Sequence, residues 1–172
     1  MVDLARLIRD VPDFPTKGII FKDITPLLAD PAALDEAVRR LAEPFAGRAV
    51  KTVTGIESRG FILGGAVARH LGAGFVPLRK PGKLPHKTIK AEYALEYGTD
   101  AVEIHTDAVA GGDKVLMLDD LLATGGTMAA ACELVERLGG DIVGIAFLIE
   151  LDFLHGRDKL ADYDIHTLIH VA

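Results

Sequence analysis

The sequence predicts an α/β fold in which helices cover both faces of a parallel sheet. Short apolar runs typical of buried strands alternate with segments of helical periodicity. Several of these runs lead directly into turns of small residues. No Pro/Gly/Ser linker or internal repeat divides the sequence, so we expect residues 1–172 to form one domain with a sizeable core.

The first part of the chain is less regular than the rest. Apolar spacing predicts a short helix over Leu4 to Val11, with Leu4, Leu7 and Ile8 on one face. The segment from Phe14 to Leu28 is expected to be irregular, because prolines and glycine interrupt it.

Helices and strands alternate from Pro31 onward. Asp30 is expected to cap the first helix, and Pro31 suits its first position. A small-residue face, Gly64, Gly65 and Ala68, would let the second helix pack closely. The pattern predicts helices at residues 31–45, 59–71 and 128–138, strands at residues 50–56, 74–78, 115–119, 142–149 and 163–171, and a β-hairpin formed by residues 87–95 and 101–105.

Composition excludes several classes of protein. Hydrophobic residues make up 49% and charged residues 26%, and the net charge of −6 argues against sequence-independent nucleic-acid binding. The single cysteine, Cys132, allows no intrachain disulfide and is expected to be a packed core thiol. The apolar stretches are shorter than the roughly 20 residues of a membrane-spanning helix, and the N-terminus lacks a secretory h-region. We therefore expect a cytoplasmic protein without nucleic-acid or membrane partners.

The segment after Val115 predicts an anion site. A strand is expected to end in Asp119 and Asp120, and a turn of small residues from Ala123 to Thr127 leads into a helix. Backbone N–H groups in such a turn, together with the helix dipole, attract a phosphate. The turn consists of Ala123, Thr124, Gly125, Gly126 and Thr127, in which glycines permit close approach and threonines add hydroxyl donors.

The composition of this segment narrows the ligand further. The lysine of a P-loop is missing from the turn, which argues against a nucleoside-triphosphate cradle. Asp119 and Asp120 would repel a phosphate but suit vicinal hydroxyls, a cation, or both. A monoester phosphate, vicinal hydroxyls and a bound magnesium ion occur together in phosphoribosyl pyrophosphate.

The segment Asp119 to Thr127 resembles the 5-phosphoribosyl-1-pyrophosphate motif of the type I phosphoribosyltransferases. Four further segments, Gly18–Leu28, Gly55–Phe61, Leu78–Pro85 and Leu95–Gly98, make the chain similar to the adenine-specific members of that family. The resemblance covers nearly the whole chain from about Phe14 onward. It implies a parallel-sheet type I phosphoribosyltransferase fold with a β-hairpin lid and an N-terminal base-binding segment within residues 1–30.

The same resemblance implies a reaction and its partners. The phosphoribosyl group would pass from phosphoribosyl pyrophosphate to adenine, giving AMP and pyrophosphate in purine salvage. Mg²⁺ would arrive with the pyrophosphoryl substrate and would lie near Asp119, because too few oxygen ligands can be placed for a dedicated protein cage. The six histidines show no metal-ligand spacing. A homodimer is also implied.

The resemblance gives the acidic and basic residues specific roles. Asp119 and Asp120 would bind the ribose hydroxyls, directly or through magnesium. Glu57 and Ser58 would form a pyrophosphate loop with a cis peptide between them, and Arg59 would bind the leaving group. Without the resemblance, the triplet of Glu57, Ser58 and Arg59 would be interpreted only as a helix cap with a charged first turn. Arg79, Lys80 and Lys83 would stabilise the departing pyrophosphate, although such a run is usually a solvated surface.

The base site and the lid carry the remaining expectations. Phe21 would stack on adenine while main-chain groups of Ile20 and Lys22 read its N6 and N1 edge; a lone phenylalanine is otherwise a core residue. Glu96 would be a candidate acid/base at the purine, and Tyr97 would close over the ligands, although both could be solvated turn residues.

Two alternative functions stay open on the sequence. A phosphoribosyltransferase for hypoxanthine, guanine or another base would share the phosphate motif. A regulator that senses phosphoribosyl pyrophosphate would keep the fold without turnover. The N-terminal loop around Phe21 favours adenine over the first alternative, and the presence of Arg59, Lys83 and Glu96 speaks against the second.

Overall fold

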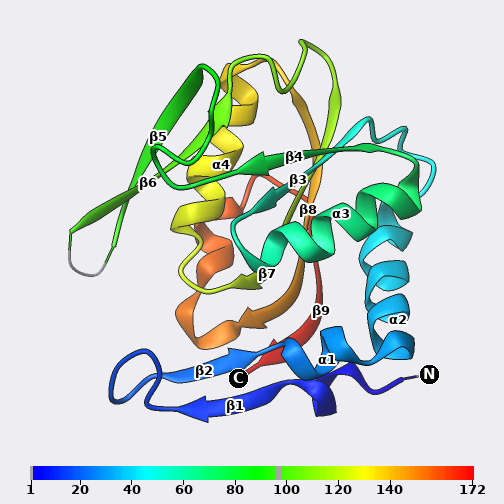
Figure 1. Cartoon of the computed structure of the whole chain (residues 1–172), viewed down its shortest axis with the longest axis vertical. Helices are drawn as coiled ribbons and strands as arrows, with labels where there is room; N and C mark the ends of the chain where they lie inside the picture. The colour runs from blue at the N-terminus through cyan, green and yellow to red at the C-terminus, as the bar shows by residue number, and fades with distance from the viewer. Residues whose placement is uncertain (1, 96–97) are drawn as a thin grey trace.

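A five-stranded parallel sheet forms the centre of the molecule (Figure 1). The computed structural model describes residues 2–95 and 98–172. The strand order is β4-β3-β7-β8-β9, with bounds Thr52–Ile56 (β3), Gly74–Leu78 (β4), Lys114–Leu122 (β7), Asp141–Leu151 (β8) and Ile165–Val171 (β9). All neighbouring pairs run parallel, which confirms the expected fold class.

Helices cover both faces of this sheet, and the alternation of side chains along β7 shows why. Leu116 and Leu118 are buried in a cluster with α2 and α3, whereas Val115 and Met117 are buried in a second cluster with α4. Because both faces are covered, the strand is apolar at every position of this run. The helices are α2 (Pro31–Ala42), α3 (Arg59–Leu71) and α4 (Gly126–Arg137), and Figure 1 shows α4 on the opposite side of the sheet from α2 and α3.

Two antiparallel hairpins lie outside the central sheet. One is formed by β5 (Thr88–Ala94) and β6 (Thr99–His105), as the sequence predicted. The other pairs β1 (Arg9–Pro12) with β2 (Ile20–Asp23) and precedes α1 (Thr25–Ala29). Figure 1 shows the β5–β6 hairpin extending away from the body of the molecule.

The N-terminal expectations were wrong in detail. Only Leu4–Leu7 are helical, as the 3₁₀ turn η1, and Arg9–Pro12 are a strand instead of helix. The segment from Phe14 to Leu28 is not wholly irregular, because β2 and α1 lie in it. The two strands were missed because β1 and β2 pair with each other across the intervening loop, and the periodicity of each segment alone does not detect such pairing.

The expected boundary around the turn of small residues, Ala123 to Thr127, was also wrong. The strand does not end at Asp119 and Asp120, because β7 continues its pairing with β8 as far as Leu122, opposite Glu150. The following helix begins at Gly126, so two residues of the expected turn belong to α4. The carboxylates therefore lie within the strand, and the turn is shorter than predicted.

Helix α2 begins as the sequence predicted. The Asp30 carboxylate accepts hydrogen bonds from the N–H groups of Ala32 and Ala33, at 3.0 and 2.9 Å, which confirms the cap. The α-helix ends at Ala42, and Glu43–Phe45 continue as the 3₁₀ turn η2.

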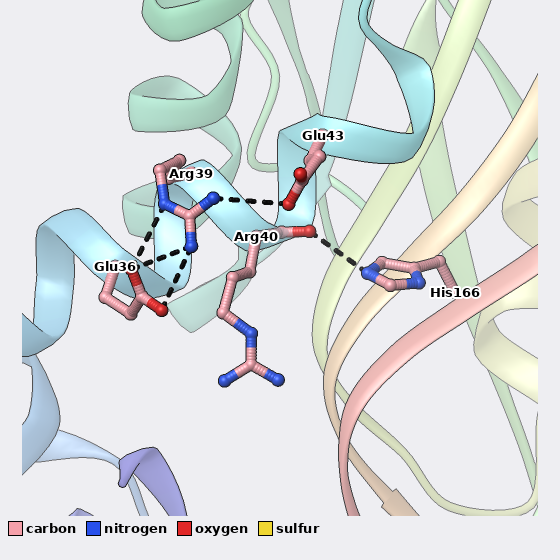
Figure 2. Close-up of polar contacts among 5 residues, drawn as sticks. All are labelled: Glu36, Arg39, Arg40, Glu43 and His166. Carbon is pink, nitrogen blue, oxygen red and sulfur yellow. Dashed lines mark hydrogen bonds and ion pairs between the residues drawn. The ribbon is translucent and has the colours of Figure 1, made fainter. Parts of the chain in front are cut away.

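The far end of α2 is tied to the edge of the sheet (Figure 2). On the helix surface Arg39 forms ion pairs with Glu36 and Glu43. The Arg40 carbonyl accepts a hydrogen bond of 3.0 Å from Nε2 of His166, a residue of β9. This contact fixes the tautomer of His166 and joins α2 to the last strand.

Within residues 2–95 and 98–172, no helix has both the length and the apolar character needed to cross a membrane.

Cys132 is buried, as expected. Burial, and to a smaller extent the nearby Glu136 carboxylate, raise the pKa of its thiol to about 12. A thiol in that state packs as an apolar group.

Candidate active site

A cleft opens where two neighbouring strands diverge. β3 and β7 pair only at Thr52 with Val115 and Val53 with Leu116, close to their amino ends. The strand order also reverses here, because the chain moves from β3 to β4 on one side and to β7, β8 and β9 on the other. Crevices at the carboxyl ends of strands beside such a reversal are the usual ligand sites of open parallel sheets.

The cleft has a volume of about 480 Å³ and is bordered by the sheet, two helices and both hairpins. Its lining residues are Phe21, Ile56, Glu57, Ser58, Arg59, Arg79, Lys80, Tyr93, Ala101, Val102, Asp119, Asp120, Leu121 and Thr127. Several groups that the sequence indicated therefore meet in one place. They are the acidic pair (Asp119 and Asp120), the 57–59 turn, Phe21, and Arg79 and Lys80 from the basic cluster of Arg79, Lys80 and Lys83.

One wall of the cleft is a chain of contacts from β7 to the N-terminal hairpin. Asp120 is buried, and its Oδ2 lies 2.9 Å from Nε of Arg59. The Arg59 guanidinium in turn lies over the ring of Phe21, with its Cζ 4.6 Å from the ring centroid. Arg59 is thus held between a carboxylate and an aromatic face, beside the part of the cleft expected to hold the base.

The two adjacent carboxylates perturb each other. Enclosure by protein atoms and the neighbouring Asp120 raise the pKa of Asp119 well above its usual value. Burial also raises the pKa of Asp120, although the Arg59 charge opposes that increase. Paired carboxylates with raised pKa values in a cleft are typical of functional sites.

The opposite wall is organised by Glu57. Its carboxylate accepts hydrogen bonds from the Lys80 backbone N–H and from Nη2 of Arg79, the latter at 3.1 Å. Burial alone would raise the pKa of Glu57, but these two donors and the charges of Arg79 and Lys83 lower it overall. Glu57 therefore anchors the loop that follows β4 and carries Arg79, Lys80 and Lys83, which we call the basic loop.

The 57–59 turn brings helix α3 close to β7. The peptide bond between Glu57 and Ser58 is cis, as the sequence analysis predicted. At Gly60 an added Cβ would lie 2.7 Å from Oδ1 of Asp119, so only glycine allows this approach. The start of α3 and the acidic pair are consequently in direct contact.

A smaller pocket of about 80 Å³ continues from the cleft into the glycine-containing turn. It is lined by Asp119, Leu121, Leu122, Ala123, Thr124, Gly125, Gly126, Thr127, Met128 and Phe147. Gly125 has a φ of +78°, and an added Cβ there would lie 2.4 Å from the Gly156 carbonyl oxygen. The turn thus lies at the N-terminus of α4, where backbone N–H groups are free to bind an anion.

Polar atoms that lack a hydrogen bond gather in the same place. Among the described residues, Nη1 of Arg59 and Nε of Arg79 are buried without a hydrogen-bond partner, and Oδ2 of Asp120 has only its ion pair with Nε of Arg59. Each belongs to a residue lining the cleft. Because buried polar groups normally have partners, this grouping indicates a site that a polar ligand completes.

Other residues indicated by the sequence lie outside the cleft lining. Ile20 is 57% exposed, and the Lys22 ammonium lies 2.7 Å from Oδ1 of Asp10. Lys83 contributes its carbonyl, which accepts a hydrogen bond of 3.3 Å from Arg79. Glu96 and Tyr97 fall outside the described residues.

Sequence reasoning missed five residues of the main cleft: Ile56, Tyr93, Ala101, Val102 and Leu121. Tyr93 is the most informative, because its hydroxyl donates to Oδ2 of Asp100 at 3.2 Å while its ring borders the cleft. The predicted hairpin could have indicated it, since alternate residues of β5 face the sheet. Val102 is opposite Ala91 in the β5–β6 register and shares that inward face.

The donors available for a metal ion fall into two places. Among the described residues, three ligand atoms within 4.8 Å of one another occur at Glu150, Asp152 and His170, away from the cleft lining. The carboxylates that line the cleft are those of Glu57, Asp119 and Asp120. Glu57 is paired with Arg79 and Asp120 with Arg59, which leaves Asp119 as the carboxylate without a cationic partner in an ion pair among the described residues. One or two carboxylates in an open cleft fit a Mg²⁺ ion that keeps water and substrate oxygens as its other ligands.

Comparison with known proteins shows to which class of protein this chain belongs. The phosphoribosyl transferase domain family matches residues 24–169, a range that includes strands β3, β4, β7 and β8, most of β9 and the turn at the start of α4. An adenine phosphoribosyltransferase of Nitrosococcus oceani is 56% identical over 170 residues, which are 99% of this chain and 99% of that protein. The chain belongs to the adenine phosphoribosyltransferase family.

Solved structures agree with this assignment. The crystal structure of adenine phosphoribosyltransferase from Rhodothermus marinus has a TM-score of 0.95 and 56% sequence identity, covering 98% of this chain and 96% of that one. The Saccharomyces cerevisiae enzyme, solved in complex with D-2,5-dideoxy-2,5-imino-altritol 1,6-bisphosphate and adenine, has a TM-score of 0.90 and 41% identity, with 96% of each chain covered.

Proposed function

We propose that this chain transfers the 5-phosphoribosyl group of phosphoribosyl pyrophosphate to adenine, giving AMP and pyrophosphate in purine salvage. One observation carries the proposal: a single cleft joins an aromatic face, a carboxylate pair and a basic loop, and continues into an anion-binding turn. Each of these parts suits a different part of the two substrates.

The phosphate and ribose would lie along β7 and the start of α4. The turn from Ala123 to Thr127 binds the 5′-phosphate through backbone N–H groups at the helix N-terminus. Asp119 and Asp120 then face the ribose hydroxyls, to which a carboxylate forms charge-assisted hydrogen bonds. This order places the anomeric carbon on the cleft side of the carboxylates.

The pyrophosphate would lie against the 57–59 turn and the basic loop. Glu57 holds the Arg79 side chain and the Lys80 backbone in place, so these cations need little reorganisation when negative charge develops on the leaving group. Lys83 adds positive charge nearby. Arg59 retains an unpaired Nη1 that can donate to the leaving group while Nε stays on Asp120.

The base would stack on Phe21. Because the side chains of Ile20 and Lys22 do not line the cleft, their contact with adenine would be through main-chain groups. Adenine N9 attacks C1 of the ribose as the bond to pyrophosphate breaks, and the N9 proton must leave. Glu96 is our candidate for the group that accepts this proton, and Tyr97 is our candidate for closing the hairpin over the ligands. Replacing Glu96 with glutamine should then lower kcat, while the affinity for adenine changes little.

Mg²⁺ would enter with phosphoribosyl pyrophosphate. When bound, it neutralises negative charge on the pyrophosphoryl oxygens and so favours departure of the leaving group. Of the chain's own residues, Asp119 would contact the ion, since Asp120 is paired with Arg59.

A turnover assay with different bases tests this function. Purified protein is incubated with Mg²⁺, phosphoribosyl pyrophosphate and either adenine, hypoxanthine or guanine, and the nucleotide is measured by chromatography. We expect AMP from adenine and at least about 100-fold lower kcat/KM for the 6-oxopurines, because a donor-for-acceptor exchange leaves buried polar groups unpaired. Asp119→Asn serves as the matched variant with impaired turnover.

Each alternative gives its own result. Preferred turnover of hypoxanthine or guanine would make the chain a phosphoribosyltransferase for another base. Binding of phosphoribosyl pyrophosphate without turnover of any base would indicate a regulator that senses it.

We also propose that the whole chain acts as one domain, that it forms a homodimer, and that it works in the cytoplasm. The first proposal is supported by Leu4, Ile24 and Leu27, which are buried in the same cluster as residues of β7 and β8. The second is the state that the resemblance to the adenine phosphoribosyltransferases implies. Light scattering coupled to size-exclusion chromatography measures the oligomeric state.

A further inference from the structure

The phosphate turn is supported from behind by the 3₁₀ segment η4 (Gly156–Leu160). Here two glycines face each other: a Cβ on Gly125 would lie 2.4 Å from the Gly156 carbonyl oxygen, and a Cβ on Gly156 would lie 2.3 Å from the Ala123 carbonyl oxygen. Leu160 at the end of η4 is fully buried in the cluster that contains α4. The position of η4 relative to the turn is therefore closely defined by packing.

An ion pair between half-buried Arg157 and buried Glu150 fixes η4 to the sheet as well. Glu150 is 4% exposed and lies opposite Leu122, the last residue of β7 before the turn. Its Oε1 is 2.7 Å from Nε of Arg157, and its Oε2 accepts a hydrogen bond of 2.9 Å from the Thr167 hydroxyl. Arg157 is thus a positioning residue that holds the backbone of η4 beside the turn.

This anchoring directs Lys159 over the start of α4. Its Nζ lies 3.9 Å from the point that a Cβ on Gly126 would occupy. The side chain is exposed, and no carboxylate of the described residues pairs with it, in contrast to its neighbour Arg157. A free ammonium group is consequently held at the turn that the proposed function assigns to the 5′-phosphate.

We propose that Lys159 is the side-chain cation of the 5′-phosphate site, delivered by η4 from outside the phosphate turn. This inference rests on the proposed function, because that function puts a monoester phosphate at the turn. The helix N-terminus supplies only about half a positive charge, whereas a monoester phosphate carries almost two negative charges at neutral pH. The turn itself contains no lysine or arginine, and Lys159 supplies the missing charge.

The test compares Lys159→Gln, Lys159→Arg and a control, Lys114→Gln. Lys114 is an exposed lysine at the amino end of β7, the opposite edge of the sheet from the turn. We expect Lys159→Gln to raise the KM for phosphoribosyl pyrophosphate about tenfold, the low end for a charge-assisted bond because the lysine is exposed. The KM for adenine should be unchanged, Lys159→Arg should restore most of the affinity, and Lys114→Gln should match the wild type.

Calorimetry with ribose 5-phosphate and with pyrophosphate separates this inference from the proposed function, because neither measurement needs turnover. Lys159→Gln should weaken ribose 5-phosphate binding about tenfold and leave pyrophosphate binding unchanged. Equal weakening of both ligands would overturn the proposal and indicate a general charge effect. Unchanged binding of ribose 5-phosphate would overturn it even if the enzyme turns over adenine normally.

A phosphorus NMR titration of bound ribose 5-phosphate provides a readout that a purely structural role would not change. A cation at the phosphate favours the dianion and lowers its second pKa. In Lys159→Gln the bound phosphate should therefore titrate at higher pH than in the wild type and the Lys114→Gln control. Identical titration curves in all three proteins would refute the contact.

Discussion

Replacing Gly125 with alanine should destabilise the protein and disrupt phosphate binding. Gly125 has a φ of +78°, and a left-handed conformation costs a non-glycine residue about 1–2 kcal/mol. The new Cβ would also lie 2.4 Å from the Gly156 carbonyl oxygen, and such overpacking typically costs about 1–3 kcal/mol. The lower entropy of the unfolded chain offsets about 0.4–1 kcal/mol of this.

Central values leave a net loss of about 3 kcal/mol in the free energy of unfolding, which for a chain of this length lowers Tm by about 6–12 °C. Gly126→Ala is the matched control. Gly126 starts α4, and its added Cβ would make only ordinary contacts, 3.5 Å from the Tyr93 ring and 3.7 Å from the Ala94 carbonyl oxygen. Its stability should stay within about 1 kcal/mol of the wild type.

Urea unfolding followed by circular dichroism measures both variants, and calorimetry measures their affinity for ribose 5-phosphate. We expect Gly125→Ala to lose stability and affinity together, because the clash displaces the turn whose N–H groups we propose to bind the phosphate. A Gly125→Ala protein as stable as Gly126→Ala would refute the reasoning. A destabilised variant with full affinity would show that the turn is not the phosphate site.

Three further variants test the walls of the cleft. Because the folded-state pKa of Asp119 is raised, this carboxyl opposes folding at every pH above the unfolded pKa of about 3.9, and the penalty is full above the folded pKa. Asp119→Asn should therefore raise Tm at pH 8 while lowering turnover, and the gain in Tm should shrink as pH falls below the folded pKa and vanish below the unfolded one. The folded-state pKa of Glu57 is lowered, so its stabilisation is fully present above the unfolded pKa of about 4.3 and is lost as pH falls through the lower folded pKa. Glu57→Gln should therefore lower Tm at pH 7, and the difference should shrink as the solution is acidified from the unfolded pKa through the folded one; a difference that is independent of pH would contradict this. Phe21→Ala should raise the KM for adenine roughly 5- to 150-fold, as expected for loss of an aromatic–base contact of about 1–3 kcal/mol, whereas an equal rise in the KM for phosphoribosyl pyrophosphate would indicate a core role.

Most of the sheet could be predicted from the sequence because strands buried on both faces consist of continuous apolar runs. Residues Gly74–Leu78 and Arg59–Leu71 have the bounds that periodicity predicted. The end of β7 did not follow from periodicity, because Asp119 and Asp120 are polar and interrupt the apolar run. Only the pairing with β8 explains why the strand continues through them.

The candidate site could be predicted where its functional residues are adjacent in the sequence. It could not be predicted where folding brings together residues that are far apart in the sequence. The phosphate turn and the acidic pair occur together in the sequence, so their composition indicated a phosphate and hydroxyl site. Tyr93 enters the cleft through the register of a hairpin, which composition does not reveal. The small-residue face of α3 was interpreted too broadly: Gly64 is required by the Phe75 ring, whereas nothing lies within 4 Å of a Cβ added at Gly65.

The positions of Arg59 and Asp120 show why sequence alone could not assign their contacts. The sequence placed Asp120 at the ribose and Arg59 at the leaving group, yet in the structure the two side chains lie 2.9 Å apart and Arg59 also covers Phe21. The pair therefore connects the expected base face to the expected ribose face through a single guanidinium. A cation in that position compensates the buried Asp120 carboxylate, and its Nη1 has no hydrogen-bond partner among the described residues. The site consequently keeps polar groups that are only partly satisfied by the protein, and substrate binding would complete their hydrogen bonds.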